Sequence, residues 1–155
     1  MRHATLVLLA IVLAGSVLMG QDLPASKVPA VVRQAFHETF PGATKVAWKL
    51  KSPTYDAEFL VNKAEVTVKF DASGKWQETE SAIPRAKVPP PVNETMAKQF
   101  GGYKVIETQD MQRVDDTRLR YEIHVENAKE IVKVMFYADG AIITRSAKPK
   151  AAAKK

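Results

Sequence analysis

The sequence contains no cysteine in its 155 residues. This absence excludes disulfide bonds, thiol nucleophiles, zinc sites with thiolate ligands and iron–sulfur clusters. A domain without disulfides depends on its apolar core for stability. The length is enough for one domain or for two small units that share a core.

Histidines and catalytic motifs are also scarce. The three histidines are His3, His37 and His124, and none stands in the HxH or HxxxH spacing that brings two ligands to one metal ion. No G-x-S-x-G motif occurs, and the run from Asp71 to Gly74 lacks the later glutamate that a calcium loop requires. The sequence therefore predicts no catalytic residue, no metal site and no cofactor, and we expect a protein that is not an enzyme.

The basic residues are numerous, but many of them lie at the two ends of the chain. The net charge is +6, and six of the 23 Lys and Arg residues are Arg2 and five residues in the last eleven positions. Residues 21–144 carry 17 basic and 17 acidic side chains. A neutral body argues against a nucleic-acid-binding face. Residues 147–155 are predicted to form a basic disordered tail, which could contact anionic surfaces weakly.

The first twenty residues have the pattern of a secretory signal peptide. Arg2 precedes an apolar stretch over residues 4–19, and the chain becomes polar at Gln21. The stretch is short for a membrane span, which needs about 20 apolar residues, so cleavage is favoured over anchoring. We therefore expect residues 1–20 to be removed and the mature protein to be periplasmic or secreted.

Two segments of the chain match each other. The segment from Val28 aligns with the segment from Val88 at an offset of 60 residues, and after a six-residue insertion the offset is 66. The aligned pairs include Phe40 with Phe100, Tyr55 with Tyr121, Val68 with Val134, Phe70 with Phe136 and Gly74 with Gly140. A duplication explains this match better than chance, and it divides the body into residues 21–84 and residues 85–146.

Each segment begins with a helical pattern and continues with alternating strands. Apolar residues recur every three or four positions from Val28 to Phe40 and from Val88 to Phe100, which predicts two amphipathic helices. The strands alternate: Val46, Trp48 and Leu50 are predicted to face inward and the lysines between them outward. Hairpins are predicted at Asn62-Lys63, Asp71–Gly74 and Tyr137–Gly140. The predicted fold is α+β, with tandem αββββ repeats and helices packed on one face of an antiparallel sheet.

Four sequence segments resemble a known family. The segments "VPAVVRQAF", "FPGATKVAW", "YDAEF" and "VKFDASGKW" are similar to those of the PepSY-like periplasmic family, whose members are similar in fold to beta-lactamase-inhibitor proteins. The second segment of the chain departs from this pattern, with Thr108 where the first has Trp48 and Gly101 where the first has Pro41. The resemblance implies an exported αββββ tandem with no known catalytic residues and a role in binding or inhibiting another protein.

The outward residues of the third strand differ between the two segments. Residues Glu65, Thr67, Lys69 and Asp71 in the first segment correspond to Ile131, Lys133, Met135 and Tyr137 in the second, and the adjoining strand adds His124. Because an apolar and aromatic patch on a polar sheet often marks an interaction site, Ile131, Met135, Tyr137 and His124 are the predicted binding residues. The alternative is that the tail, the loop at 109–120 or a second copy of the protein covers this patch.

Two functions are consistent with these features. The first is an exported, non-catalytic binding module that contacts another envelope protein or a peptide through its open sheet face. The alternative is a periplasmic small-ligand-binding or envelope-sensing protein with a cleft between the repeats. A pocket with several convergent polar groups would favour the alternative, and a flat face with Tyr137 and Met135 would favour the first. The sequence leaves the partner and the oligomeric state open.

Overall fold

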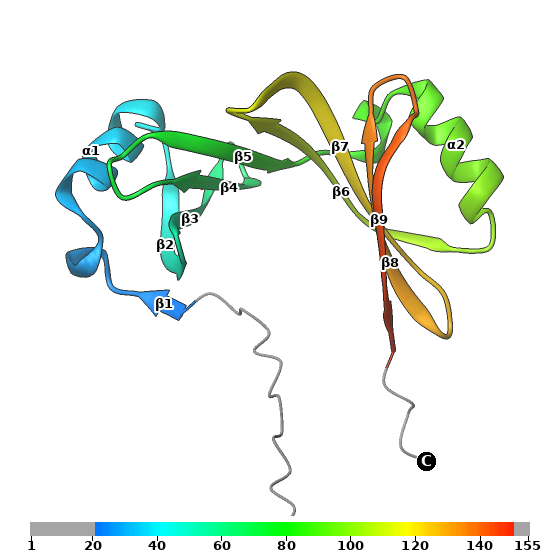
Figure 1. The fold of residues 1–155 in the computed structure, drawn as a ribbon, viewed down its shortest axis with the longest axis horizontal. Coiled ribbons are helices and arrows are strands. Elements are labelled where there is room, and N and C mark those ends of the chain that lie inside the picture. Colours follow the sequence, from blue (N-terminus) through cyan, green and yellow to red (C-terminus); the bar gives the residue numbers. More distant parts are fainter. Residues whose placement is uncertain (1–20, 151–155) are drawn as a thin grey trace, which may run out of the picture.

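A computed structural model describes residues 21–150 (Figure 1). The predicted signal peptide at residues 1–20 and the last five residues of the predicted tail lie outside the described residues. Within residues 21–150 the chain forms two α-helices, two short 3-10 turns and nine β-strands. In chain order these are β1 (Gln21–Leu23), η1 (Ala25–Lys27), α1 (Ala30–Thr39), β2 (Thr44–Lys51), β3 (Thr54–Val61), β4 (Ala64–Phe70), β5 (Trp76–Ala82), η2 (Arg85–Lys87), α2 (Pro90–Phe100), β6 (Lys104–Arg113), β7 (Asp116–Glu126), β8 (Glu130–Tyr137) and β9 (Ile142–Pro149).

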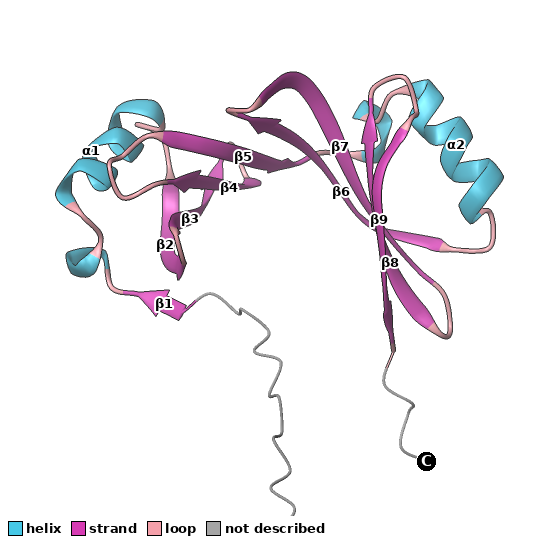
Figure 2. Cartoon of the chain, viewed as in Figure 1, coloured by secondary structure: helices cyan, strands magenta, loops and turns pink. Residues whose placement is uncertain are grey.

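All nine strands belong to one antiparallel sheet, and their order in the sheet is their order in the sequence. Each helix precedes four strands, α1 before β2–β5 and α2 before β6–β9. The two helices lie at opposite ends of the molecule with the strands between them (Figure 2). The fold is therefore α+β, as expected, with two helices and a nine-stranded antiparallel sheet. No helix among the described residues is long and apolar enough to cross a membrane.

Each helix covers its own apolar core. Val32 and Phe36 of α1 pack with Trp48 and the inward residues of β3 and β4, whereas Val92, Met96 and Phe100 of α2 pack with β7 and β8. The two cores have no residue in common. Both lie on the same face of the sheet, because one row of directly paired residues joins them: Phe59, Val66, Ser81, Asp110, Tyr121 and Phe136.

The predicted hairpins have the expected backbone. Asn62 and Lys63 both have positive φ, at 50° and 69°. These angles are typical of a two-residue hairpin turn, whose twist fits that of the flanking strands. Gly74 and Gly140 also have positive φ, at 83° and 85°, a conformation that favours glycine. Gly140 also allows close packing, since an added Cβ would lie 2.6 Å from the carbonyl oxygen of Pro91.

The prediction that Val46 faces inward is wrong. The register of β2 against β3 shifts between Thr44 and Ala47, and Lys45 has a φ of 55°, so Val46 leaves the alternation and is 38% exposed. The same irregularity occurs in β6 between Val105 and Glu107, where Ile106 is 42% exposed. A bulge adds one residue to a strand and reverses the facing of the residues before it, which is why simple alternation fails there.

Both ends of the sheet differ from the sequence-based interpretation. Strand β1 was not predicted, and it pairs with β2 through Gln21–Leu23. Strand β9 continues to Pro149, and Lys150 Nζ forms an ion pair of 2.7 Å with Glu126 Oε2. The first residues of the predicted disordered tail, 147–149, therefore belong to the sheet.

Candidate binding surface

The face of the sheet opposite the two helices carries all four predicted binding residues. Side chains alternate between the two faces along each strand, so the residues next to the core-facing ones point to this opposite face. No helix of residues 21–150 covers it. In Figure 1 the helices lie at the outer ends, and the strands span the distance between them. We call this side of the sheet the helix-free face.

A ladder of charges with alternating sign crosses the helix-free face. It has one residue on each of seven consecutive strands, and each residue is the direct cross-strand partner of the next. Opposite charges in direct cross-strand pairs stabilise a sheet. From β1 to β7 the ladder consists of Asp22, Lys49, Asp56, Lys69, Glu78, Arg113 and Asp116.

The centre of the ladder is buried. Glu78 is only 6% exposed, and it accepts hydrogen bonds from Lys69 Nζ and, at 2.8 Å, from Arg113 Nη1. Burial raises the pKa of the Glu78 carboxyl. Burial alone would lower the pKa of Lys69, but its hydrogen bonds to Glu78 and Glu80 outweigh that effect and raise the pKa above its usual value. These charges therefore neutralise one another around the buried carboxylate of Glu78.

Asp56 is the most buried acid of the ladder, with 0% of its surface exposed. Its Oδ1 accepts a hydrogen bond of 2.8 Å from the Thr54 hydroxyl, and its Oδ2 lies 3.4 Å from Lys51 Nζ. The neighbouring Lys49 bonds instead to Glu58, at 2.7 Å. Each acid on β3 thus lies beside a lysine of β2, but the buried Asp56 Oδ2 forms no hydrogen bond within the described residues.

Tyr137 lies at the far end of the helix-free face, where an arginine covers it. The guanidinium carbon of Arg118 is 3.9 Å from the centre of the Tyr137 ring, and Arg118 Nη2 donates a 2.6 Å hydrogen bond to the tyrosine hydroxyl. That hydroxyl donates in turn to Asp116 Oδ2 at 3.2 Å. Hydrogen bonds from the side chain and backbone of Arg118, and then from Arg120, hold the pKa of Asp116 well below its usual range. The side chain of Arg118 is 63% exposed, so it forms the outer surface of this cluster.

His124 lies between two carboxylates. Its Nδ1 is 2.6 Å from Glu107 Oε2, and its Nε2 is 2.8 Å from Glu122 Oε1. Lys133 Nζ also binds Glu122, at 2.8 Å. The predicted binding residue His124 is therefore part of a network that spans β6, β7 and β8.

The apolar residues of the predicted patch are less accessible than expected. Met135 pairs with Glu122 and Ile131 with Glu126 across β7 and β8. Ile131, Met135 and Tyr137 lie on the same side of β8, and all three are half-buried rather than exposed. The structure thus brings them together with His124 on one face, but it intersperses them with paired charges.

Sequence reasoning missed two features of this surface. Arg118 was not singled out, although arginine and tyrosine are each enriched at protein interfaces. Met111 points to the helix-free face opposite Glu80 and Arg120, yet it is buried. The charged residues of each strand can be read from the sequence. Only the pairing between strands shows that these residues lie opposite one another and form a ladder.

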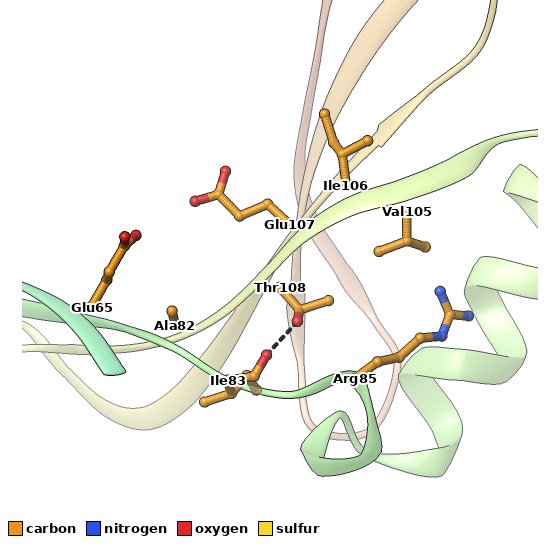
Figure 3. Close-up of a pocket in the computed structure, with 8 residues that line it drawn as sticks. All are labelled: Glu65, Ala82, Ile83, Arg85, Val105, Ile106, Glu107 and Thr108. Carbon is orange, nitrogen blue, oxygen red and sulfur yellow. Dashed lines mark hydrogen bonds between the residues drawn. The ribbon is translucent and has the colours of Figure 1, made fainter. Parts of the chain in front are cut away.

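A shallow hollow of about 520 Å³ lies where the two halves of the sheet join (Figure 3). Glu65 and Glu107 line one side of it, and the guanidinium of Arg85 points away from both. The Thr108 hydroxyl is already used in a 2.6 Å hydrogen bond to the carbonyl oxygen of Ile83. The polar groups therefore diverge, and within residues 21–150 no cluster of three or more His, Asp or Glu side chains is arranged to hold a metal ion.

A similar hollow of about 440 Å³ lies beside β1, and it includes Leu23, Val46 and Trp48. Their counterparts 60 residues later, Ile83, Ile106 and Thr108, line the hollow at the junction. Both hollows lie beside a strand irregularity, at Val46 and at Ile106. The bulge in β6 therefore accounts for the junction hollow. The hollow is not evidence for the predicted ligand-binding cleft between the repeats.

The fold and surface define a class of protein: an open antiparallel sheet with helices on one face and a charged, partly aromatic face on the other. The PepSY-like family profile, described as beta-lactamase-inhibitor-like, matches residues 53–144. The chain belongs to this family, which confirms the resemblance found in its sequence. No curated protein matches the chain.

Several solved structures share the fold. A DUF2874 family protein from Bacteroides uniformis is 26% identical with a TM-score of 0.72, and the match covers 77% of this chain and 88% of the other. A BLIP-like protein from Bacteroides fragilis is 20% identical with a TM-score of 0.69, covering 86% and 93% of the two chains. A protein from Bacteroides eggerthii, provisionally described as periplasmic, is 20% identical with a TM-score of 0.73, covering 77% and 88%.

Proposed function

We propose that this protein is an exported, non-catalytic module that binds another envelope protein or a peptide through its helix-free face. The observation that carries the proposal is the cluster of Arg118, Tyr137 and Met135 on a face that no described helix covers. Arginine and tyrosine are enriched among the residues that dominate binding at protein interfaces. Membership of a beta-lactamase-inhibitor-like family supports a binding role.

The charge ladder suits a surface that stays rigid when it binds. Lys69, Glu78 and Arg113 satisfy one another, so a partner does not need to order them. Less side-chain freedom is then lost on association, which favours affinity. Arg118 is the exposed member of the cluster, and we propose it as the first contact, with Tyr137 beneath it and Met135 two residues from Tyr137 on the same side of β8.

The duplication belongs to the same proposal. We propose that residues 21–84 and 85–146 descend from one αββββ unit, and that residues 1–20 direct export and are removed. The shared offsets of 60 and 66 residues support the duplication. Divergence of the outward residues of β4 and β8, charged in the first unit and mixed in the second, then explains why the binding cluster lies in the second unit.

The alternative, a small-ligand site between the units, has less support. The junction hollow is open, its polar groups diverge, and a similar hollow occurs beside β1. A site for a small molecule is normally enclosed and has a few convergent polar groups.

Site-directed photo-crosslinking tests the proposed surface. A photoreactive residue in place of Lys133, which is exposed on the same side of β8 as Met135 and Tyr137, should capture a partner in the envelope of the source cell. The same residue in place of Glu38, on the exposed side of α1, is the matched control. Capture should be lost when Tyr137→Asp and Met135→Lys are added. Equal capture from both positions, or capture that the double substitution leaves unchanged, would contradict the proposal.

A further inference from the structure

The outer edge of β9 is a second surface with the features of a binding site. Strand β9 pairs only with β8 among residues 21–150, although it is eight residues long. All of its residues except Ile143 are exposed. An edge of this kind presents backbone N–H and C=O groups that can pair with another strand.

Strand β5 shows how the corresponding edge is used elsewhere in the molecule. It lies 66 residues before β9, and each of the two strands is the last of four that follow a helix. Strand β5 pairs with β4 on one edge and with β6 on the other, through Glu78–Ala82 against Gln109–Arg113. Strand β9 pairs with β8 as β5 pairs with β4. On its other edge, no strand of the described residues corresponds to β6.

The charges near β9 restrict what can pair with it. Arg145 and Lys148 are exposed, and no Asp or Glu follows Asp139 in the sequence. Arg145 is opposite the inward residue Val134 and Lys148 is opposite Ile131, so the two basic side chains lie on different faces of the sheet. Lys150 is already paired with Glu126, and the guanidinium carbon of Arg145 lies 5.1 Å from the centre of the Phe100 ring.

A second copy of this chain is a poor match for the β9 edge. The strand equivalent to β6 is β2, and in the β5–β6 register Lys148 would stand opposite Lys49 and Ser146 opposite Lys51. Two β9 edges would likewise bring basic strands together. Like charges directly opposite each other destabilise a pair of strands.

We propose that the β9 edge binds an extended acidic segment of a partner protein, which adds to the sheet as a tenth, antiparallel strand between Ile142 and Lys148. Backbone hydrogen bonds would supply the binding, and acidic side chains opposite Arg145 and Lys148 would supply the selectivity. These two positions are three residues apart, so the partner should carry two acidic residues with the same spacing. Pro149 lacks an N–H group and limits the pairing at that end. This surface is separate from the cluster around Tyr137.

A peptide made from the protein's own β6 sequence is a suitable probe. In the β5–β6 register Gln112 is opposite Thr79 and Gln109 is opposite Ala82, the counterparts of Arg145 and Lys148. A synthetic peptide of residues 104–113 with Gln109→Glu and Gln112→Glu therefore places carboxylates opposite both basic residues. The same peptide with Gln109→Lys and Gln112→Lys is the control.

Amide hydrogen exchange and titration by NMR measure the outcome on the protein without residues 1–20. We expect the Glu peptide to slow exchange in residues 142–148 and to bind about tenfold tighter than the Lys peptide, as two reversed cross-strand charge pairs predict. The Arg145→Glu, Lys148→Glu protein, checked for folding by circular dichroism, should prefer the Lys peptide. Equal binding of both peptides, no saturable binding, or shifts confined to the Tyr137 cluster would overturn the proposal. Protection of 142–148 that grows with protein concentration in the absence of peptide would overturn it in favour of self-association.

Discussion

Trp48 and Lys49 are adjacent in the sequence and have different environments in the structure. Trp48 is buried, and its ring centre lies 5.2 Å from that of Phe36 in an edge-to-face contact. Lys49 is half-buried and bonds to Glu58. We expect Trp48→Ala to lower the free energy of unfolding by about 3–5 kcal/mol, because it leaves a cavity in the core. Lys49→Ala should cost about 0.5 kcal/mol, typical of a partly exposed ion pair.

Urea denaturation of the two variants measures this difference. If the midpoints of Trp48→Ala and Lys49→Ala were equal, the inward assignment of Trp48 would be wrong. The fluorescence of Trp76 remains in the Trp48→Ala variant and can follow its unfolding.

Asp116 predicts how stability depends on pH. Its pKa is lowered in the folded protein by hydrogen bonds from Arg118 and Arg120. A carboxyl with a lowered folded pKa contributes stability above the pKa of the unfolded chain, about 3.9, and loses that contribution as the pH falls through the folded pKa. We therefore expect Asp116→Asn to be less stable than the parent at pH 6, with a difference that shrinks below about pH 4.

Urea midpoints between pH 7 and pH 2 check the Asp116 prediction. Glu94→Gln, at an exposed position of α2, serves as the control and should show no comparable change in stability. A difference between parent and Asp116→Asn that stayed constant down to pH 2 would show that the carboxylate charge is not what stabilises the cluster.

The hairpin between β8 and β9 depends on a glycine at its end. A Cβ at position 140 would lie 2.6 Å from the carbonyl oxygen of Pro91 and 3.0 Å from Thr95 Oγ1, and φ is +85°. Gly140→Ala should therefore cost about 2–4 kcal/mol, from backbone strain and from the forced separation of the hairpin and α2. Gly42→Ala is the matched control: nothing lies within 4 Å of its added Cβ and its φ is not in the positive range, so it should be neutral or stabilising by up to about 1 kcal/mol.

Thermal unfolding of Gly140→Ala and Gly42→Ala compares the two positions. Similar melting temperatures would indicate that the β8–β9 turn and the N-terminal end of α2 can move apart without loss of stability.

At the level of elements, sequence patterns predict most of the fold because alternation and helical spacing are local properties. The hairpins at Asn62-Lys63 and Gly140 are marked by Asn62 and Gly140, whose residue types tolerate positive φ. The bulge at Lys45 could not be predicted, because lysine has no preference for positive φ and tertiary pairing imposes it. The charge ladder was missed for a related reason: it depends on the register between strands, which a pattern within one strand does not contain.

For the candidate site, the sequence correctly predicts which residues of β8 share a face but not how they are covered. The partner of Tyr137 is Arg118, which lies 19 residues earlier, and the contact arises because β7 and β8 are adjacent. The segment 109–120, expected to be a loop that could cover the patch, instead forms the ends of β6 and β7, and arginines bind Asp115 and Asp116 at their turn. Short side-chain networks of this kind are a product of folding and have no signature in composition.

Across the whole molecule, two separate cores are joined by one pair of strands. The five residue pairs between β5 and β6 and the ion pair between Glu78 and Arg113 connect them. Both tryptophans, Trp48 and Trp76, belong to the first core or pack against it. We expect Phe136→Ala, which removes a fully buried ring from the second core, to cost about 3–5 kcal/mol there and to separate two unfolding transitions.

Far-UV circular dichroism and tryptophan fluorescence, followed together in urea, test this separation. In the Phe136→Ala variant the circular dichroism should begin to change at lower urea than the fluorescence, because fluorescence reports on the first core. The parent protein provides the reference for each probe. Coincident transitions that shift together would show that the β5–β6 connection makes the two cores a single cooperative unit.

The order of strands in the sheet bears on how the protein acquires its structure. Each strand pairs only with its neighbours in the sequence, from β1 to β9; six of the eight pairs are hairpins, and the β1–β2 and β5–β6 pairs each enclose a helix. The loss of chain entropy on closing the six hairpins is therefore small, and local pairing of this kind is associated with fast folding. The protein can fold progressively from its N-terminal strands onward, each new hairpin adding to the edge already formed, which leaves little time for an unpaired strand to aggregate.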